Sequence, residues 1–113
     1  MKLVYVAGPY RGKDNYQIHK NVCRAEDLAL LVWKAGAAAI CPHLNTEHFQ
    51  GAAPDEVWLN GDLEIITRCD ALILVPDWET SVGTRHEIEF ARERGIPVFY
   101  NMADLNAWLE ASK

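Results

Sequence analysis

The 113-residue sequence has no long hydrophobic run and few cysteines. No stretch reaches the roughly 18 apolar residues that a membrane-spanning helix needs, and the opening MKLVYVAGPYRGKD soon turns polar. The three cysteines (Cys23, Cys41 and Cys69) form no CxxC pair, so we expect reduced thiols in a cytoplasmic protein. Secretion, a disulfide framework and a membrane partner are therefore not expected.

Basic residues are fewer than acidic residues. The chain carries 11 Lys and Arg against 16 Asp and Glu, for a net charge of −5, and only residues 1–34 have more bases than acids. A chain without a basic stripe lacks the electrostatic footprint of a protein that binds a nucleic-acid polymer. A small basic loop is still sufficient to hold a single phosphate, so the charge pattern favours a small ligand over DNA or RNA.

The order of the sequence patterns predicts one α/β domain over residues 1–113. Length and a 50% hydrophobic content fit a single soluble core. Strands are expected at 3–7, 37–41, 71–75 and 96–100, and helices at about 14–36, 55–68, 83–94 and 103–112. This alternation predicts a doubly wound parallel sheet, flavodoxin-like, with strand order 2-1-3-4 and helices on both faces.

In such a sheet, the ligand lies beyond the carboxyl ends of the strands where the order reverses, between the first and third strands. This brings GPYRG (8–12) beside PDWETSVG (76–83). Arg11 is placed to pair with a phosphate, and Ser81, Gly83 and Thr84 open a helix whose N–H groups attract anions. The long loop at 43–55 has no helical or strand periodicity and is expected to take part in binding a ligand.

Two acids fall on apolar helix faces. In the helix expected at 83–94, Glu87 shares an arc with Ile88, Phe90 and Ala91. In the preceding helix, Asp62 lies in the middle of an arc made by Trp58, Leu59, Leu63, Ile65, Ile66 and Cys69. Two inward carboxyl groups near one crevice suit glycoside-bond chemistry, in which one captures the sugar and the other handles a proton or hydroxyl.

Simpler interpretations account for the same residues. Thr84 and Glu87 fit a capping box, in which Glu87 returns to a backbone N–H. Asp62 fits a structural acid held by backbone donors or by Arg68, and Ser81 fits a plain helix cap. Cys41, His43 and His48 lack the spacing and number of ligands of a zinc site, so no metal is expected.

Four motifs together resemble the nucleoside 2-deoxyribosyltransferase superfamily, including its nucleoside 5'-monophosphate N-glycosidase branch. They cover nearly the whole chain: Tyr5-x-x-Gly8, Arg11-Gly12, Asp62-Leu63 with Asp70 eight positions later, and Ser81-x-Gly83-x-x-x-Glu87. The resemblance implies that Glu87 is the nucleophile of a retaining reaction, that Tyr5 orients it, and that Asp62 contacts the sugar or assists the departing base. It implies a 5' pocket formed by the first loop, with Gly8, Arg11 and Gly12, and by Ser81 and Gly83.

The expected activity is cleavage of the N-glycosidic bond of a (2'-deoxy)nucleoside 5'-monophosphate, with the sugar passed to water or another base and no cofactor. Serine at position 81 donates to phosphate, whereas related transferases tend to carry an acid there. The alternatives are a transferase acting on free nucleosides, a non-catalytic nucleotide-binding module, and an interaction domain in which Glu87 only caps a helix.

The sequence says least about which nucleobase is recognised and about the quaternary structure. His43 is a candidate contact to the base. The resemblance also implies a homo-oligomer with shared sites, in which Asn101 donates to the neighbouring site. Trp58, Trp108 and Phe49 are expected to be exposed at an interface.

Overall fold

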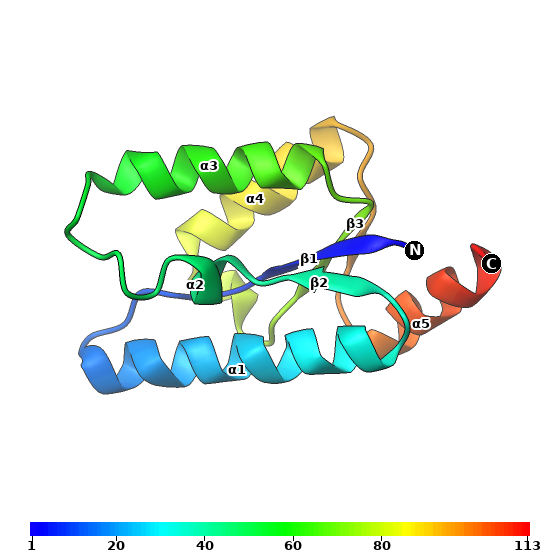
Figure 1. Ribbon diagram of the computed structural model, residues 1–113, viewed down its shortest axis with the longest axis horizontal. Coiled ribbons are helices and arrows are strands. Elements are labelled where there is room, and N and C mark those ends of the chain that lie inside the picture. Colours follow the sequence, from blue (N-terminus) through cyan, green and yellow to red (C-terminus); the bar gives the residue numbers. More distant parts are fainter.

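The computed structural model describes all 113 residues, Met1–Lys113. Strands and helices alternate along most of the chain (Figure 1). The elements are β1 (Leu3–Ala7), α1 (Asn15–Lys34), β2 (Ala38–Ile40), α2 (Pro42–Asn45), α3 (Asp55–Thr67), β3 (Ala71–Leu74), the single 3-10 turn η1 (Trp78–Thr80), α4 (Val82–Glu93), β4 (Val98–Phe99) and α5 (Met102–Ala111).

The four strands form one parallel sheet in the order β2-β1-β3-β4, which confirms the expected fold. The central pair is the longest, and its register aligns Tyr5 with Leu72 and Ala7 with Leu74. The edge strands are short, with three residues in β2 and two in β4. The strand order reverses between β1 and β3, so the crevice expected there lies at the carboxyl ends of these two strands.

Alternate residues of β1 divide the core into two halves. Val4 and Val6 pack with buried residues of α1 and α5, whereas Tyr5 and Ala7 pack with buried residues of α3 and α4. Figure 1 shows α1 on one side of the sheet, with α3 and α4 together on the other. The period-2 pattern of a strand therefore sends Tyr5 toward the two helices that carry the inward acids.

The helix boundaries follow local capping signals. Asp14 accepts a hydrogen bond from the Gln17 N–H at 2.8 Å and begins α1, and Gly36 follows that helix with a φ of 94°. The expected helix at 83–94 begins one residue earlier, at Val82, because Ser81 is its N-cap. These differences are within the usual uncertainty of helix ends.

Two local expectations are wrong. The segment expected to be loop throughout 43–55 begins within a short helix, α2, because Pro42 occupies the first helical position, where proline is well tolerated. Leu59 does not share the inward face of α3, since it is 52% exposed, while the neighbouring Trp58 is half-buried. One helical position corresponds to about 100°, which turns Leu59 away from the sheet.

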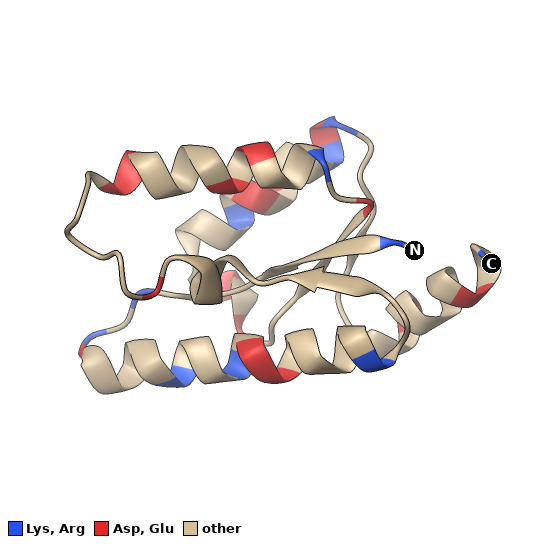
Figure 2. Cartoon of the chain, in the orientation of Figure 1, with Lys and Arg blue, Asp and Glu red and all other residues tan.

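Charged residues are absent from all four strands and lie on helices and loops (Figure 2). This is the composition expected of a parallel sheet covered on both faces. None of the helices is long and apolar enough to cross a membrane.

Candidate active site

The candidate site begins at Tyr5, in the middle of β1. Its side chain is fully buried, and its hydroxyl donates a hydrogen bond to Oε2 of Glu87 on α4. Burial raises the pKa of Tyr5 well above its ordinary value, and the negative charges of Glu87 and Asp62 raise it further. Tyr5 therefore stays protonated and acts as a fixed donor in this contact.

Glu87 lies on the second turn of α4, half-buried beside the buried Ile88. Burial raises the pKa of Glu87 to about 7; the Tyr5 hydrogen bond works against this rise and the charge of Asp62 adds to it. The carboxyl group is thus near the point of ionisation at neutral pH, which is typical of groups that exchange a proton or attack a carbon.

Asp62 lies on α3, half-buried, and burial alone raises its pKa to about 6. No donor within the protein bonds to its carboxyl group. Arg68 is not its partner, because that guanidinium pairs with Glu64 at 3.0 Å. The interpretation of Asp62 as an acid held by Arg68 or by backbone donors is therefore wrong, and the carboxyl group is left free for a ligand.

Three elements thus bring three polar groups together on one side of the sheet. Tyr5 comes from β1, Asp62 from α3 and Glu87 from α4, and the charge of Asp62 is felt by both other groups. The charge of Asp62 raises the pKa of Glu87, so the ionisation of one carboxyl group affects that of the other. Such a pair can supply one ionised and one protonated carboxyl group in a single site.

The N-terminus of α4 is built around Ser81. The Ser81 Oγ accepts hydrogen bonds from the Thr84 N–H at 3.1 Å and from the Thr84 hydroxyl at 2.9 Å. The capping-box interpretation of Glu87 is wrong, because Ser81 is the cap and Glu87 bonds to Tyr5 instead. With both acceptor positions of Ser81 used, its own hydroxyl proton is left to donate outward.

The three glycines expected at the site differ in what surrounds them. A Cβ on Gly8 would lie 2.5 Å from Cβ of Val75, and a Cβ on Gly12 would lie 2.6 Å from Cγ of Gln17. Both glycines are therefore required by close packing within the protein. A Cβ on Gly83 would meet only the Ser81 Oγ, at 3.9 Å, so the backbone there faces open space.

Arg11 lies in the loop at residues 8–14 that follows β1, which we call the first loop. Its side chain is 73% exposed and pairs with Asp55 at the start of α3. Gln50 also donates to Asp55, at 3.2 Å, so Arg11 holds the first loop to the end of the 43–55 segment. The Arg11 side chain contacts Asp55 and makes no hydrogen bond to Ser81 or Gly83.

His43 and Asn101 make contacts within the protein. The His43 Nε2 lies 2.9 Å from the Gly8 carbonyl oxygen and 3.0 Å from that of Pro9, where its N–H donates. Burial lowers the pKa of His43, which keeps the ring neutral. Asn101 caps α5 by accepting from the Asp104 N–H at 2.8 Å. His43 therefore fixes the backbone of the first loop, and Asn101 begins a helix.

Asp70 lies away from the candidate site, whereas Trp58 lies on the same helix as Asp62. Asp70 accepts from the Leu3 N–H at 2.8 Å, at the amino end of β1 and away from the carboxyl ends where the crevice lies. The indole N–H of Trp58, one helical turn before Asp62, is buried without an acceptor in the protein. The structure contains no cluster of three or more side chains able to ligate a metal ion.

Sequence reasoning missed Asn21 and Arg24 on α1. Asn21 is buried and bonds to carbonyl groups of the first loop, and Arg24 bonds to the segment after β3. The sequence does contain a signal for Asn21, because it is a polar residue between Ile18 and Ala25 on the expected apolar face of the helix. Such a residue is buried only when its amide finds partners.

The parallel four-stranded sheet has the fold of a solved 2-deoxyribosyltransferase. A solved structure of a 2-deoxyribosyltransferase from the psychrotolerant bacterium Bacillus psychrosaccharolyticus superposes with a TM-score of 0.63 at 22% identity, over 85% of this chain and 69% of that one. That enzyme is described as a biocatalyst for the synthesis of nucleosides.

The chain belongs to the family described as Domain of unknown function (DUF7768), whose model matches residues 2–101. This match spans every strand and the three residues Tyr5, Asp62 and Glu87. No curated protein matches the sequence.

Proposed function

We propose that the protein is an enzyme that cleaves the N-glycosidic bond of a (2'-deoxy)nucleoside 5'-monophosphate and passes the sugar phosphate to water or another base. The observation that carries the proposal is the hydrogen bond from buried Tyr5 to Glu87, with Asp62 close enough to raise the pKa of Glu87. The shared fold with a 2-deoxyribosyltransferase supports the same class of chemistry.

The reactive form has Glu87 ionised and Asp62 protonated. It is the minor form of the singly protonated pair, because the pKa of Glu87, about 7, lies above that of Asp62, about 6. In the first step, a Glu87 oxygen forms a bond to the anomeric carbon, the C–N bond breaks, and the departing base takes the proton of Asp62. Tyr5 keeps the attacking carboxylate oriented by donating to its other oxygen. Water then attacks the same carbon, the ester to Glu87 breaks, and Asp62 takes back a proton.

A monophosphate is favoured over a free nucleoside by the geometry of Ser81. Because the Ser81 Oγ already accepts two hydrogen bonds, it meets a ligand only as a donor, and a phosphate offers acceptors. Ser81 lies six residues before Glu87, which is about 9 Å along the helix axis. A sugar 5'-phosphate lying along α4 would reach from the carboxylate to this cap. The amide at the open Gly83 adds a second donor.

The direct test is to incubate the protein with deoxynucleoside 5'-monophosphates and the matching nucleosides and to measure the release of free base. Glu87→Ala is expected to lower the rate at least about 1,000-fold, because it removes the nucleophile. Glu89→Ala, an exposed acid two residues further along the same helix, is the matched control. Equal rates for wild type and Glu87→Ala would overturn the assignment.

The same panel separates the two alternatives. A nucleoside 2-deoxyribosyltransferase would act on free nucleosides only when a second base is present to accept the sugar. A nucleotide-binding module without activity would show ligand-induced thermal stabilisation but no base release, and its binding would survive Glu87→Ala.

We further propose that residues 1–113 act as one cytoplasmic domain that associates as a homo-oligomer. Two of the aromatic residues expected at an interface are not exposed: Trp58 packs on Phe49, and Trp108 packs on Phe99. Three large apolar residues that are about half exposed, Leu30, Leu31 and Trp33, lie close together in the sequence of α1. Light scattering coupled to size-exclusion chromatography tests the association, and a monomer at all concentrations would contradict it.

A further inference from the structure

Helix α1 carries two polar side chains that take no part in the proposed reaction but bind the loops beside it. The first is Asn21, which is only 4% exposed. Its Nδ2 donates to the carbonyl oxygens of Tyr10 at 3.1 Å and Arg11 at 3.2 Å. Its Oδ1 accepts from Gln17 Nε2 at 3.0 Å, which fixes the orientation of the amide. Asn21 therefore ties the first loop to α1.

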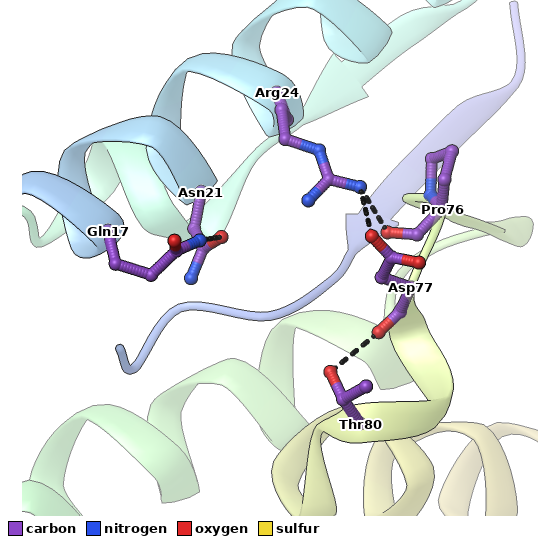
Figure 3. A network of polar contacts seen from close by, with 6 residues as sticks. All are labelled: Gln17, Asn21, Arg24, Pro76, Asp77 and Thr80. Atoms are coloured by element: carbon purple, nitrogen blue, oxygen red, sulfur yellow. Dashed lines mark hydrogen bonds and ion pairs between the residues drawn. The ribbon is translucent and has the colours of Figure 1, made fainter. Parts of the chain in front are cut away.

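The second is Arg24, one helical turn further along. Its Nη2 donates to the carbonyl oxygen of Pro76 at 2.8 Å and to Oδ2 of Asp77 at 3.1 Å. Pro76 and Asp77 belong to residues 75–81, which follow β3 and which we call the second loop. Figure 3 shows Arg24 reaching from α1 to this loop, with Asn21 and Gln17 on the same helix.

The second loop needs such support at Asp77. This is the one residue other than glycine with a positive φ, at 70°, in the left-handed region that side chains disfavour. The Thr80 hydroxyl donates to the Asp77 carbonyl oxygen at 2.8 Å, and Arg24 holds the Asp77 carboxylate. The turn at Asp77 directs the chain through η1 to Ser81, the cap of α4.

Asn21 and Arg24 are three positions apart, so they project from the same side of one rigid helix. The two loops start from a common base, where the Val75 N–H donates to the Ala7 carbonyl oxygen at 2.8 Å. Beyond that base, the hydrogen bonds of Asn21 and Arg24 join each loop to α1 rather than to the other loop.

We infer that Asn21 and Arg24 are positioning residues. Through them, α1 sets the spacing between the two loops and thereby the position in which Ser81 binds the 5' phosphate. This inference rests on the proposed function. Glu87 is held separately by Tyr5 from β1, so loosening the second loop should change phosphate binding more than the chemical step.

The test uses Arg24→Ala, Arg24→Lys and the control Arg68→Ala. Arg68 forms a surface ion pair with Glu64 at 3.0 Å and contacts neither loop. For a nucleoside 5'-monophosphate, Arg24→Ala should raise KM about tenfold, with kcat within about twofold of wild type. For the matching nucleoside, kcat/KM should stay unchanged. Arg24→Lys should recover part of the loss, because an ammonium group can donate to one of the two acceptors.

Hydrogen exchange of the free protein provides a readout that does not depend on activity. Arg24→Ala should speed exchange of the amides at 77–84, and Arg68→Ala should not. Faster exchange in a protein that releases no base would leave the positioning role standing and remove the proposed function. If base is released but Arg24→Ala and Arg68→Ala have the same KM and the same exchange rates, the positioning role is overturned. An equal loss of kcat/KM on the nucleoside and on the nucleotide would overturn it as well.

Discussion

The hydroxyl of Tyr5 donates to Oε2 of Glu87 although the two residues are 82 positions apart in the sequence. One comes from the central strand and the other from a helix that covers the sheet. The hydrogen bond is part-buried, so water competes with it little. It orients a carboxyl group that burial would otherwise leave neutral, and it favours the ionised form that the proposed reaction needs.

Replacing Tyr5 with Phe should move the falling limb of the pH profile of kcat/KM to higher pH and lower the rate at pH 6 to 7. The Tyr5 hydrogen bond lowers the pKa of Glu87, so its loss lets burial raise that pKa further. A hydrogen bond to a charged group is worth about 1.5–3 kcal/mol, which corresponds to a shift of about one to two pH units. Tyr16→Phe, at an exposed position on α1, is the control. A limb that stays in place would show that Tyr5 does not tune Glu87.

Activity should peak at about pH 6 to 7, between the pKa values of Asp62, about 6, and Glu87, about 7. In this range the pair carries one proton, which the reactive form requires. Asp62→Asn should remove the limb that falls at high pH and lower the rate about 100-fold or more. The rising limb that remains should then report the ionisation of Glu87 alone. A profile identical to that of wild type would exclude Asp62 as the proton donor.

Stability should fall as pH rises from about 4 to about 7. The folded protein holds a proton on Glu87 up to a pKa of about 7, against an ordinary value of 4.5, so it binds more protons than the unfolded chain in this range. The stabilisation is complete below the unfolded value and is lost as pH passes the folded one. Glu87→Gln should therefore be more stable than wild type at pH 8, by an amount on the order of 2 kcal/mol, and close to it at pH 4.

Urea unfolding at the two pH values measures this difference. Glu89→Gln on the same helix corrects for the loss of a negative charge from α4. If the advantage of Glu87→Gln over wild type is the same at both pH values, Glu87 is not protonated in the folded protein.

Gly83→Ala should preserve the fold and weaken binding of a monophosphate. A Cβ at this position meets nothing closer than the Ser81 Oγ at 3.9 Å, so stability should be unchanged or up to about 1 kcal/mol higher. The new methyl group would occupy the space beside the backbone amides, and KM should rise about tenfold. Gly61→Ala, also open and in the middle of α3, controls for helix propensity, and thermal unfolding with steady-state kinetics measures both effects. If KM is unaffected, no ligand approaches the backbone at Gly83.

Asp55→Asn should lower KM for the monophosphate if Arg11 belongs to the phosphate pocket. The substitution weakens the ion pair that holds the exposed Arg11 against α3 and releases its guanidinium. Arg11→Ala should raise KM in the same assay. If neither variant changes KM, Arg11 only fastens the first loop to α3.

The sequence was sufficient to predict the strand order because each strand is a short apolar run between helices with regular spacing, which allows few topologies. It also predicted that Glu87 and Asp62 face inward, since an acid on an apolar arc is unusual wherever it occurs, and both are half-buried. Leu59 was wrongly predicted to face inward, because helical spacing alone does not show where the buried face of α3 ends. The roles of Gly8 and Gly12 also required coordinates, because the atoms that exclude a Cβ there belong to Val75 and Gln17, which no spacing rule connects to them.

The two outer strands of the sheet offer very little free backbone to another chain. A foreign strand that added beside β2 or β4 would find only two or three residues to pair with. Extension of the sheet from one molecule to the next, the usual route to fibrous aggregates, is therefore disfavoured at both ends. Ordered assembly of this protein is therefore expected to use helix faces rather than strand edges.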